Sequence, residues 1–324
     1  MLIQRASGHV SVTGEPGETL ETAVEIEDPT KSFVIYSELH EEGEAQYFKF
    51  EMDSGTRLRM TLMIPTEYAS TLFRPTLVIM GPGLTNSSNI SDHITEHVEM
   101  PADTGIMIFN EALQLAEYEG FTPSYFYLLE DVSLTVPETG VYYFAVYDET
   151  SHGRYVITIS YRKTFTIDEW LLVPINVISI HIWEGQNLVL VLAPLLLTVV
   201  IGLFLIHKKQ RENEKIAKPT TYIGLIGGLL IIGSGILLFY QMVWALLFVP
   251  ANLQILITSI FGILPILLGF YTLRTLMRLE KEPKIADNMK LIVVAIASLF
   301  VWGGLLVGPV LLVSIGLLSI IQLR

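Results

Sequence analysis

Three long stretches of the sequence contain no Asp, Glu, Lys or Arg, namely residues 185–207, 219–273 and 291–323. About 20 apolar helical residues are enough to cross the hydrocarbon core of a bilayer. The first stretch therefore predicts one membrane-spanning helix, and the second, much longer stretch predicts two. This pattern excludes a single soluble globule and predicts an α-helical transmembrane bundle over residues 187–324.

The third stretch has two interpretations. It can form one long helix that bends near Gly308-Pro309, or two short segments that meet around residues 303–309. Because each half alone is too short to cross a membrane, the single bent helix is the favoured interpretation. The predicted transmembrane domain then has four helices, at about residues 187–206, 221–245, 252–273 and 291–320.

Charge is divided unequally between the two ends of the chain. Residues 1–186 contain 9 Lys and Arg against 28 Asp and Glu, a net charge of −19. Residues 187–324 contain 11 against 5, a net charge of +6, which brings the whole chain to −13. The acidic half argues against a nucleic-acid binder. The absence of cysteine excludes disulfides and thiol catalysis.

Basic residues gather in two predicted loops, after the first and after the third helix. The first loop holds Lys208, Lys209, Arg211, Lys215 and Lys218, and the second holds Arg274, Arg278, Lys281, Lys284 and Lys290. The positive-inside rule makes both loops cytoplasmic, so the acidic region lies outside. We therefore predict a multi-pass protein of the plasma membrane. Because the first residues lack a signal-peptide pattern, export is expected to use a leader removed before residue 1, or the first helix as a reverse anchor.

Residues 20–162 show the period-two pattern of β-strands. In residues 46–52, Phe48 and Phe50 alternate with Tyr47 and Lys49, which predicts a half-buried antiparallel strand. Further strands follow with turn signals between them. The predicted fold class is therefore an all-β sandwich or jelly-roll external domain over residues 1–164, followed by the transmembrane bundle.

The β region contains several aromatic and glycine motifs. They are Glu44-Ala-Gln-Tyr47-Phe48-Lys-Phe50, then Gly55-x-x-Leu58, and later Gly140-Val-Tyr142-Tyr143 with Gly153-Arg-Tyr155. These motifs resemble the pre-peptidase C-terminal (PPC) domain of bacterial and archaeal proteins, over about residues 18–162 with an insertion at about 82–127. The resemblance implies a small β-sandwich that binds or localises rather than catalyses. The sequence departs from the family at Ala45-Gln46, where an acidic residue commonly precedes the tyrosine. No family is recognised for the membrane half.

The insertion carries one chemical motif. His93, Glu96 and His97 match H-x-x-E-H, in which two histidines on one helical face bind zinc and the glutamate acts as a base. A five-residue match arises easily, and a catalytic zinc site needs a third protein ligand. A solvated polar loop is therefore the preferred interpretation, with metal binding and hydrolysis as the alternatives.

Four further features are candidate sites. Asn86 and Asn89 lie in N-x-S glycosylation patterns. Trp170 and Trp183 flank an apolar juxtamembrane segment, residues 165–186, predicted to lie on the membrane surface or to form a collar that joins the two halves. Finally, the pairs Gly224 with Gly228 and Gly304 with Gly308 form G-x-x-x-G motifs, which predict close packing of helices.

The leading functional hypothesis is a non-catalytic binding or accessory subunit of a cell-surface membrane complex. Its expected partners are the lipid bilayer, other membrane subunits or a second copy of the chain, and a glycan or other surface ligand; no nucleic acid and no cofactor are expected. The predicted spans contain no ionisable residue, which argues against ion-coupled transport. The alternatives are a metal-dependent surface hydrolase built on the H-x-x-E-H segment, and a channel or lipid-handling protein.

Overall fold

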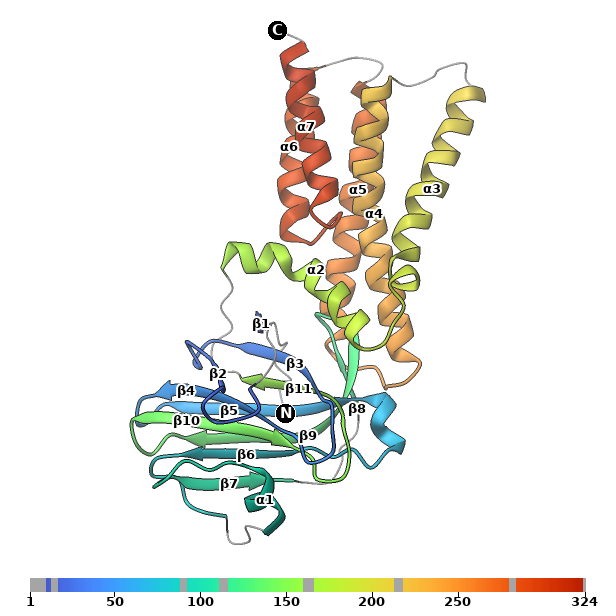
Figure 1. The fold of residues 1–324 in the computed structure, drawn as a ribbon. Helices are drawn as coiled ribbons and strands as arrows, with labels where there is room; N and C mark the ends of the chain where they lie inside the picture. The colour runs from blue at the N-terminus through green and yellow to red at the C-terminus, as the bar shows by residue number, and fades with distance from the viewer. Residues whose placement is uncertain are drawn as a thin grey trace. The chain divides into compact units, whose positions relative to one another are not determined.

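The computed structural model describes residues 10–12, 17–87, 92–110, 116–159, 166–212, 218–279 and 284–322. The chain divides into two compact units, which Figure 1 shows together with their helices and strands. The two-sheet unit contains Ser7–Glu117 and Tyr125–Phe165. The helical unit contains Thr166–Arg324 and, from within the β region, the short segment Tyr118–Ser124.

The described strands of the N-terminal half form two sheets. One has the order β1 (Val10–Val12), β3 (Phe33–Leu39), β11 (Gly153–Ile159), β5 (Arg57–Pro65), β9 (Ser124–Thr135) and β8 (Ala116–Glu119). The other has the order β2 (Val24–Glu25), β4 (Ala45–Met52), β10 (Gly140–Tyr147), β6 (Thr76–Gly81) and β7 (Gly105–Phe109). Most neighbouring strands are antiparallel, and β10 pairs with β4 from Gly140 opposite Met52 to Tyr147 opposite Ala45.

Side chains of both sheets join one hydrophobic cluster. The alternating residues Leu58, Met60 and Leu62 of β5 are buried in it, as the period-two pattern predicts. From the other sheet, Phe48 and Phe144 stack in it with their ring centroids 4.6 Å apart. This shared core gives the N-terminal half its β architecture.

Strand β4 differs from the predicted half-buried strand, because both of its faces are covered. Phe48 and Phe50 enter the shared core, whereas Tyr47 joins a second buried cluster on the other face. Ile94 and Val98, in and beside helix α1 (Asp92–His97), belong to that second cluster. The insertion thus supplies an apolar cover for this sheet.

The C-terminal half is helical. It contains α2 (Ile167–Trp183), α3 (Leu188–Glu212), α4 (Pro219–Leu246), α5 (Ile255–Leu279), α6 (Ile285–Phe300) and α7 (Val307–Gln322). Helices α3, α4 and α5 are long and apolar enough to cross a membrane, which indicates a membrane protein. With a rise of about 1.5 Å per residue, the 28-residue α4 is about 42 Å long, against about 30 Å for a hydrocarbon core.

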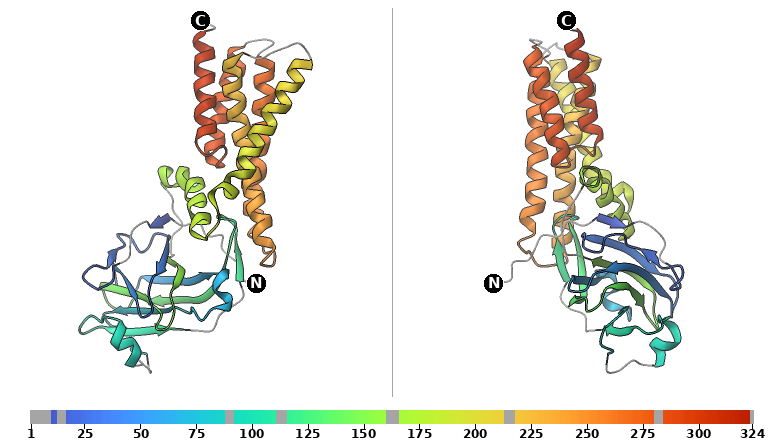
Figure 2. Two further views of the ribbon diagram at one scale, coloured as in Figure 1. Left: turned by 45° about the vertical axis from the view of Figure 1, so that its right-hand side comes forward. Right: turned by 90° about the vertical axis from the view of Figure 1, so that its left-hand side faces the viewer.

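The third charge-free stretch forms two helices, α6 and α7, and not the single bent helix favoured by the sequence. Figure 2 shows them side by side. At the end of α6 the N–H of Gly303 donates to the carbonyl oxygen of Ser298 at 2.7 Å, while Trp302 has a φ of 59°. This is the Schellman pattern that ends a helix. Leu305 and Leu306 also have positive φ, so the chain reverses over residues 301–306. The α7 end of this hairpin therefore returns to the side on which α6 begins.

Candidate functional site

The loop between strands β8 and β9, Tyr118–Ser124, is built into the helical unit and is called the hairpin tip below. Thr258 on α5 donates through Oγ1 to the carbonyl oxygen of Gly120 at 2.6 Å. Since that proton is used, the hydroxyl of Tyr118, also 2.6 Å away, donates to Thr258 Oγ1. Asn252 Nδ2 donates to the Tyr118 carbonyl at 2.9 Å, and the Gly120 N–H donates to Gln254 Oε1 at 3.0 Å. The residues around the start of α5 therefore hold the tip by four hydrogen bonds.

Burial explains why these bonds matter. Both Tyr118 and Thr258 are at most 1% exposed. Burial raises the pKa of the Tyr118 hydroxyl well above its ordinary value, so this group remains a neutral donor. Gly120 has no room for a side chain, because an added Cβ would overlap the carbonyl oxygen of Gln254. The hairpin tip is therefore closely packed against α5 within the helical unit.

Four aromatic side chains from separate parts of the helical unit pack together beside this contact. They are Phe121 of the hairpin tip, Trp170 of α2, Phe261 of α5 and Trp302 of the α6–α7 turn. Phe261 and Trp302 are stacked with centroids 4.0 Å apart, and Trp170 lies 5.0 Å from Trp302. Phe121 is 5.9 Å from Trp302. These separations are typical of favourable ring contacts.

The same cluster includes Trp302 of the strained turn after α6. A left-handed backbone at a residue other than glycine costs about 1–3 kcal/mol, and Trp302 adopts one. Its ring is buried among the aromatic neighbours, while its Nε1 has no hydrogen-bond partner among the described residues. Trp170 Nε1 donates to the Phe300 carbonyl oxygen at 3.1 Å. Residues in and beside the turn, the hairpin tip, α2 and α5 therefore form one interlocked region, which we call the junction.

A buried polar cluster lies between α2 and α4. His181 and Gln241 are both 0% exposed. His181 Nδ1 lies 2.9 Å from Glu184 Oε2, and Gln241 Nε2 donates to Gln186 Oε1 at 3.0 Å. Gln186 Nε2 is 3.3 Å from the same His181 nitrogen. The ionisable pair His181 and Glu184 therefore lies beside α4, and the apolar sequence of α4 contains no Asp, Glu, Lys or Arg.

Three atoms of this cluster have no hydrogen-bond partner among the described residues. They are His181 Nε2, Glu184 Oε1 and Gln241 Oε1. Buried polar atoms without a protein partner are commonly satisfied by ordered water. Because α4 exceeds a hydrocarbon core by about 12 Å, roughly its last eight residues, which include Gln241, can extend into the interfacial region, where water is present.

The H-x-x-E-H residues lie on α1, a helix of six residues. The His93 side chain lies outside the described residues. His97 stacks on Tyr147, with centroids 5.6 Å apart and planes inclined by 23°. Burial raises the pKa of Tyr147 to about 12, with Glu149, Asp148 and Glu96 adding to the effect. Among the described side chains, no three His, Asp or Glu are grouped as a metal site would require. The metal hypothesis stays a prediction.

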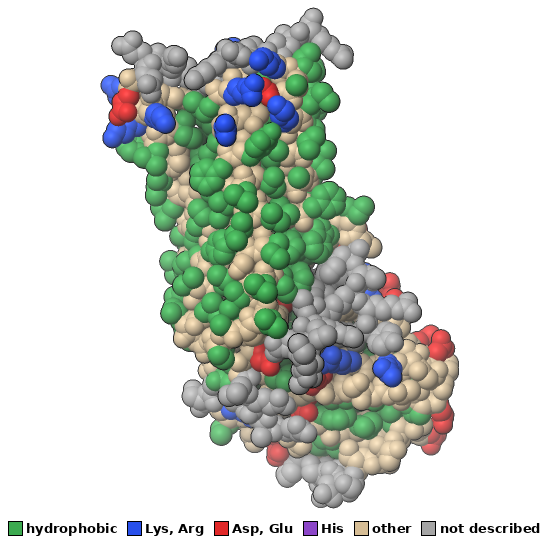
Figure 3. Space-filling view, turned by 180° about the vertical axis from the view of Figure 1, so that it is seen from behind, with side chains coloured by type: hydrophobic (Ala, Val, Ile, Leu, Met, Phe, Trp, Pro, Cys, Tyr) green, Lys and Arg blue, Asp and Glu red, His purple; other side chains and the backbone are tan. Residues whose placement is uncertain are grey.

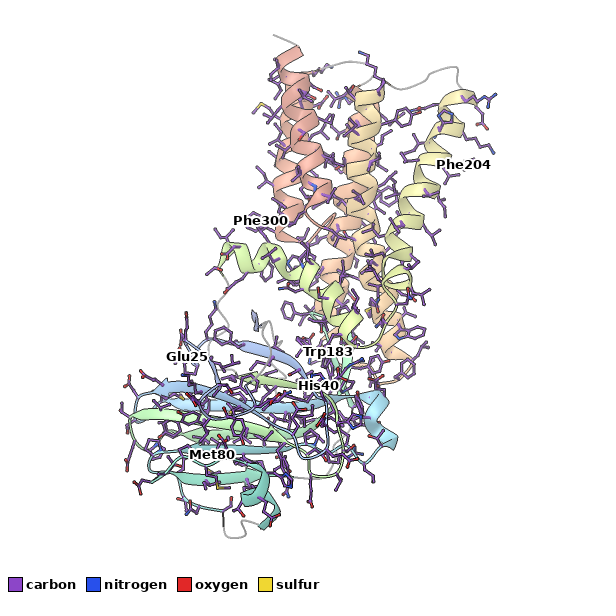
Figure 4. All side chains as sticks on the ribbon, in the orientation of Figure 1. Glu25, His40, Met80, Trp183, Phe204 and Phe300 are labelled. Carbon is purple, nitrogen blue, oxygen red and sulfur yellow. The ribbon has the colours of Figure 1, made fainter. Side chains whose placement is uncertain are left out.

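The two glycosylation candidates differ in what the structure describes. Asn86 is exposed, and its Oδ1 accepts from the N–H of Ile106 at 2.9 Å. Asn89 lies outside the described residues. Trp183, at the end of α2, is half-buried, and Figure 4 labels it. Glycosylation at Asn86 and Asn89 and interfacial roles for Trp170 and Trp183 stay predictions.

The predicted glycine motifs lie at close helix contacts. An added Cβ on Gly224 would lie 2.8 Å from Leu276, and one on Gly228 3.0 Å from Leu273, both on α5. Gly308 of α7 approaches the backbone of Gly227, and Gly304 has a φ of 78° and lies close to Ile231.

Tighter glycine contacts involve Gly235, Gly262 and Gly269, which the motifs do not include, together with Gly228, which they do. A Cβ on Gly235 would overlap the carbonyl oxygen of Gly262, and one on Gly269 would lie 2.7 Å from the Gly228 oxygen. These pairs join α4 to α5 directly. Two helices carry them, so a spacing rule within one helix does not reveal them.

Sequence reasoning also missed the hairpin tip and the residues that hold it. The only local signal was a Gly-Phe-Thr-Pro turn at residues 120–123 between two strand patterns. Thr258 and Phe261 read as ordinary members of an apolar span. Their contacts with Gly120 and Phe121 join residues more than 130 positions apart, which no local pattern encodes.

Comparisons with known proteins add one likeness. No family model and no curated protein matches this chain. Among solved structures, it is similar to the pre-peptidase C-terminal domain of a collagenase from Bacillus anthracis, with 12% identity and a TM-score of 0.24. The similarity covers 45% of this chain and 99% of that domain. That domain is of the type that the sequence motifs of the N-terminal half resemble.

Proposed function

We propose that this chain is a non-catalytic binding and accessory subunit of a membrane complex. In this proposal the two-sheet unit is a β-sandwich outside the plasma membrane that binds a glycan or another surface ligand. The helical unit anchors it and contacts the helices of a partner subunit, or of a second copy of this chain. The two basic loops face the cytoplasm.

The hairpin tip is the observation that carries the proposal. A simple membrane anchor needs one crossing of the chain from the external unit to the first helix. Among the described residues, the chain enters the helical unit twice, once at Tyr118–Ser124 and once at Thr166. The first entry supplies four hydrogen bonds and one aromatic ring to the helices. Strand β9 continues along the chain directly from the tip.

Helix α3 supports a role in contacting other helices. Only Val191, Leu195 and Gln210 of its described residues are buried. Phe204, which Figure 4 labels, is 64% exposed. Van der Waals packing between helices is the main source of helix association in lipid, so a long apolar helix with one free side suits a partner subunit.

Site-specific photo-crosslinking in native membranes tests this proposal. A photoreactive residue at Phe204 should give one discrete product with a single partner chain or a second copy. The matched control places the same residue at Val293 on α6, which is 63% exposed. Crosslinking of Phe204 to lipid alone, or equal protein products from both positions, would argue against a partner surface on α3.

A further inference from the structure

A groove runs between α5 and α6 near the end of the helices where basic residues gather. Its volume is about 570 Å³, within the range of small-molecule sites. Leu268 and Tyr271 line it from α5, and Ala286, Met289, Lys290, Val293 and Val294 line it from α6. The lining is apolar except for Lys290 and the Tyr271 hydroxyl.

Lys290 lines this groove and shares the carboxylate of Asp287 with a second cation, Arg278. Lys290 Nζ lies 2.6 Å from Asp287 Oδ1, and Arg278 Nε lies 3.6 Å from Asp287 Oδ2. Both cations remain accessible, with 47% and 60% of their side chains exposed. A single carboxylate therefore orients two exposed basic groups and balances only one of them.

The charge of the surrounding segment has the same sign. Residues 274–290 contain five basic and three acidic side chains, a net charge of +2. Figure 3 shows Lys and Arg side chains gathered at one end of the helices, with hydrophobic side chains along their length. An apolar groove that ends in excess positive charge is complementary to a molecule with an acyl chain and an anionic head.

We infer that the α5–α6 groove binds a phospholipid with an anionic headgroup. One acyl chain lies against Leu268, Met289 and Val293, and the phosphate accepts hydrogen bonds from Lys290 and Arg278. Charge-assisted bonds of this type are stronger than neutral ones. A zwitterionic phospholipid fills the same groove but gains less from the net positive charge. The inference rests on the helical unit alone and is independent of the proposed accessory role.

Native mass spectrometry of the purified full chain tests this inference. The protein is mixed with phosphatidylglycerol or with phosphatidylcholine of the same acyl chains. We expect phosphatidylglycerol to bind about tenfold more tightly, because its headgroup carries a net negative charge that the net charge of +2 beside the groove attracts, whereas the headgroup of phosphatidylcholine is neutral overall. Lys290→Gln should remove most of this preference. Lys208→Gln is the matched control, because it removes the same charge on α3 and should keep the preference.

A second variant tests the apolar part of the groove independently of the charge on Lys290. It also keeps the inference testable if Lys290→Gln does not fold. Val293→Trp places a bulky ring in the apolar part at an exposed position. It should weaken both lipids while circular dichroism stays unchanged. Inorganic phosphate at millimolar concentration should not compete. Equal affinity for the two lipids, equal effects of Lys290→Gln and Lys208→Gln, or displacement by phosphate would each overturn the inference.

Discussion

Replacing Thr258 with valine removes one hydroxyl from the contact between the hairpin tip and α5 and preserves the shape of the side chain. Two buried groups then lose their partner, the Tyr118 hydroxyl and the Gly120 carbonyl oxygen. An unsatisfied buried polar group costs about 1–3 kcal/mol. We therefore expect Thr258→Val to destabilise the helical unit by about 3 kcal/mol.

The unfolding midpoint translates this cost into a measurable shift. One kcal/mol changes the midpoint by about 2–4 °C for a unit of 150–250 residues. Thr258→Val should therefore unfold about 6–12 °C below the wild type. Circular dichroism of the helices in detergent micelles measures this midpoint. The matched control is Thr272→Val on the same helix. Thr272 is buried too, but its hydroxyl bonds only the Leu268 carbonyl of its own helix, so a shift of about 2 °C or less is expected.

A double-mutant cycle with Tyr118→Phe isolates the contact. Once the Tyr118 hydroxyl is absent, Thr258→Val leaves one buried group unpaired in place of two. Its cost should fall by about 1 kcal/mol or more, which is the coupling expected of direct partners. Additive effects, or equal shifts for Thr258→Val and Thr272→Val, would refute the hydrogen-bonded insertion of the tip.

Three further predictions concern other parts of the structure. Trp170→Ala removes two ring contacts and one hydrogen bond, so it should lower the unfolding midpoint of the helices by about 5 °C or more. It should also increase protease cleavage before α2, and unchanged cleavage would contradict this. Gly235→Leu should disrupt α4–α5 packing and lower the yield of folded protein, whereas Gly55→Leu, at an open turn, should affect only the two-sheet unit. Burial raises the pKa of the Asp148 carboxyl above its ordinary 3.8. The contribution of this group to the free energy of unfolding is therefore fully present below pH 3.8, where the carboxyl is protonated, and is lost as the pH rises through the raised pKa. The stability advantage of wild type over Asp148→Asn should therefore shrink as urea unfolding is repeated from pH 3 to pH 7, and a constant advantage refutes it.

The β architecture was largely predictable, because alternation along single strands reports burial directly. The pattern of Leu58, Met60 and Leu62 identifies β5 without any knowledge of its neighbours. The second buried face of β4 was not predictable, since the covering residues Ile94 and Val98 come from a distant insertion.

The side chain of Gln46, which precedes Tyr47, forms four hydrogen bonds. Gln46 is 2% exposed, and its Oε1 accepts from the hydroxyls of Ser37 and Tyr155 at 2.9 and 2.6 Å. Its Nε2 donates to Glu44 and to the Glu38 carbonyl oxygen. The buried amide therefore satisfies donors and acceptors at once, whereas an ionised carboxylate only accepts.

The long helices of the membrane half were predictable from the sequence, whereas the contacts between them were not. Charge-free length alone locates α3, α4 and α5. The reversal after α6 depends on left-handed backbone at Trp302, Leu305 and Leu306, residue types that do not signal a turn. The buried cluster of His181 and Gln241 was missed because each residue, taken alone, is unremarkable near a membrane interface.

The native mass of the protein, extracted gently from its own membranes into lipid nanodiscs, tests the accessory-subunit role. We expect one defined mass that contains this chain together with a partner subunit or a second copy in fixed stoichiometry. We also expect Thr258→Val to weaken this assembly more than Thr272→Val does. A single chain that carries only lipid, under conditions in which other complexes from the same membranes stay intact, would contradict the accessory-subunit role.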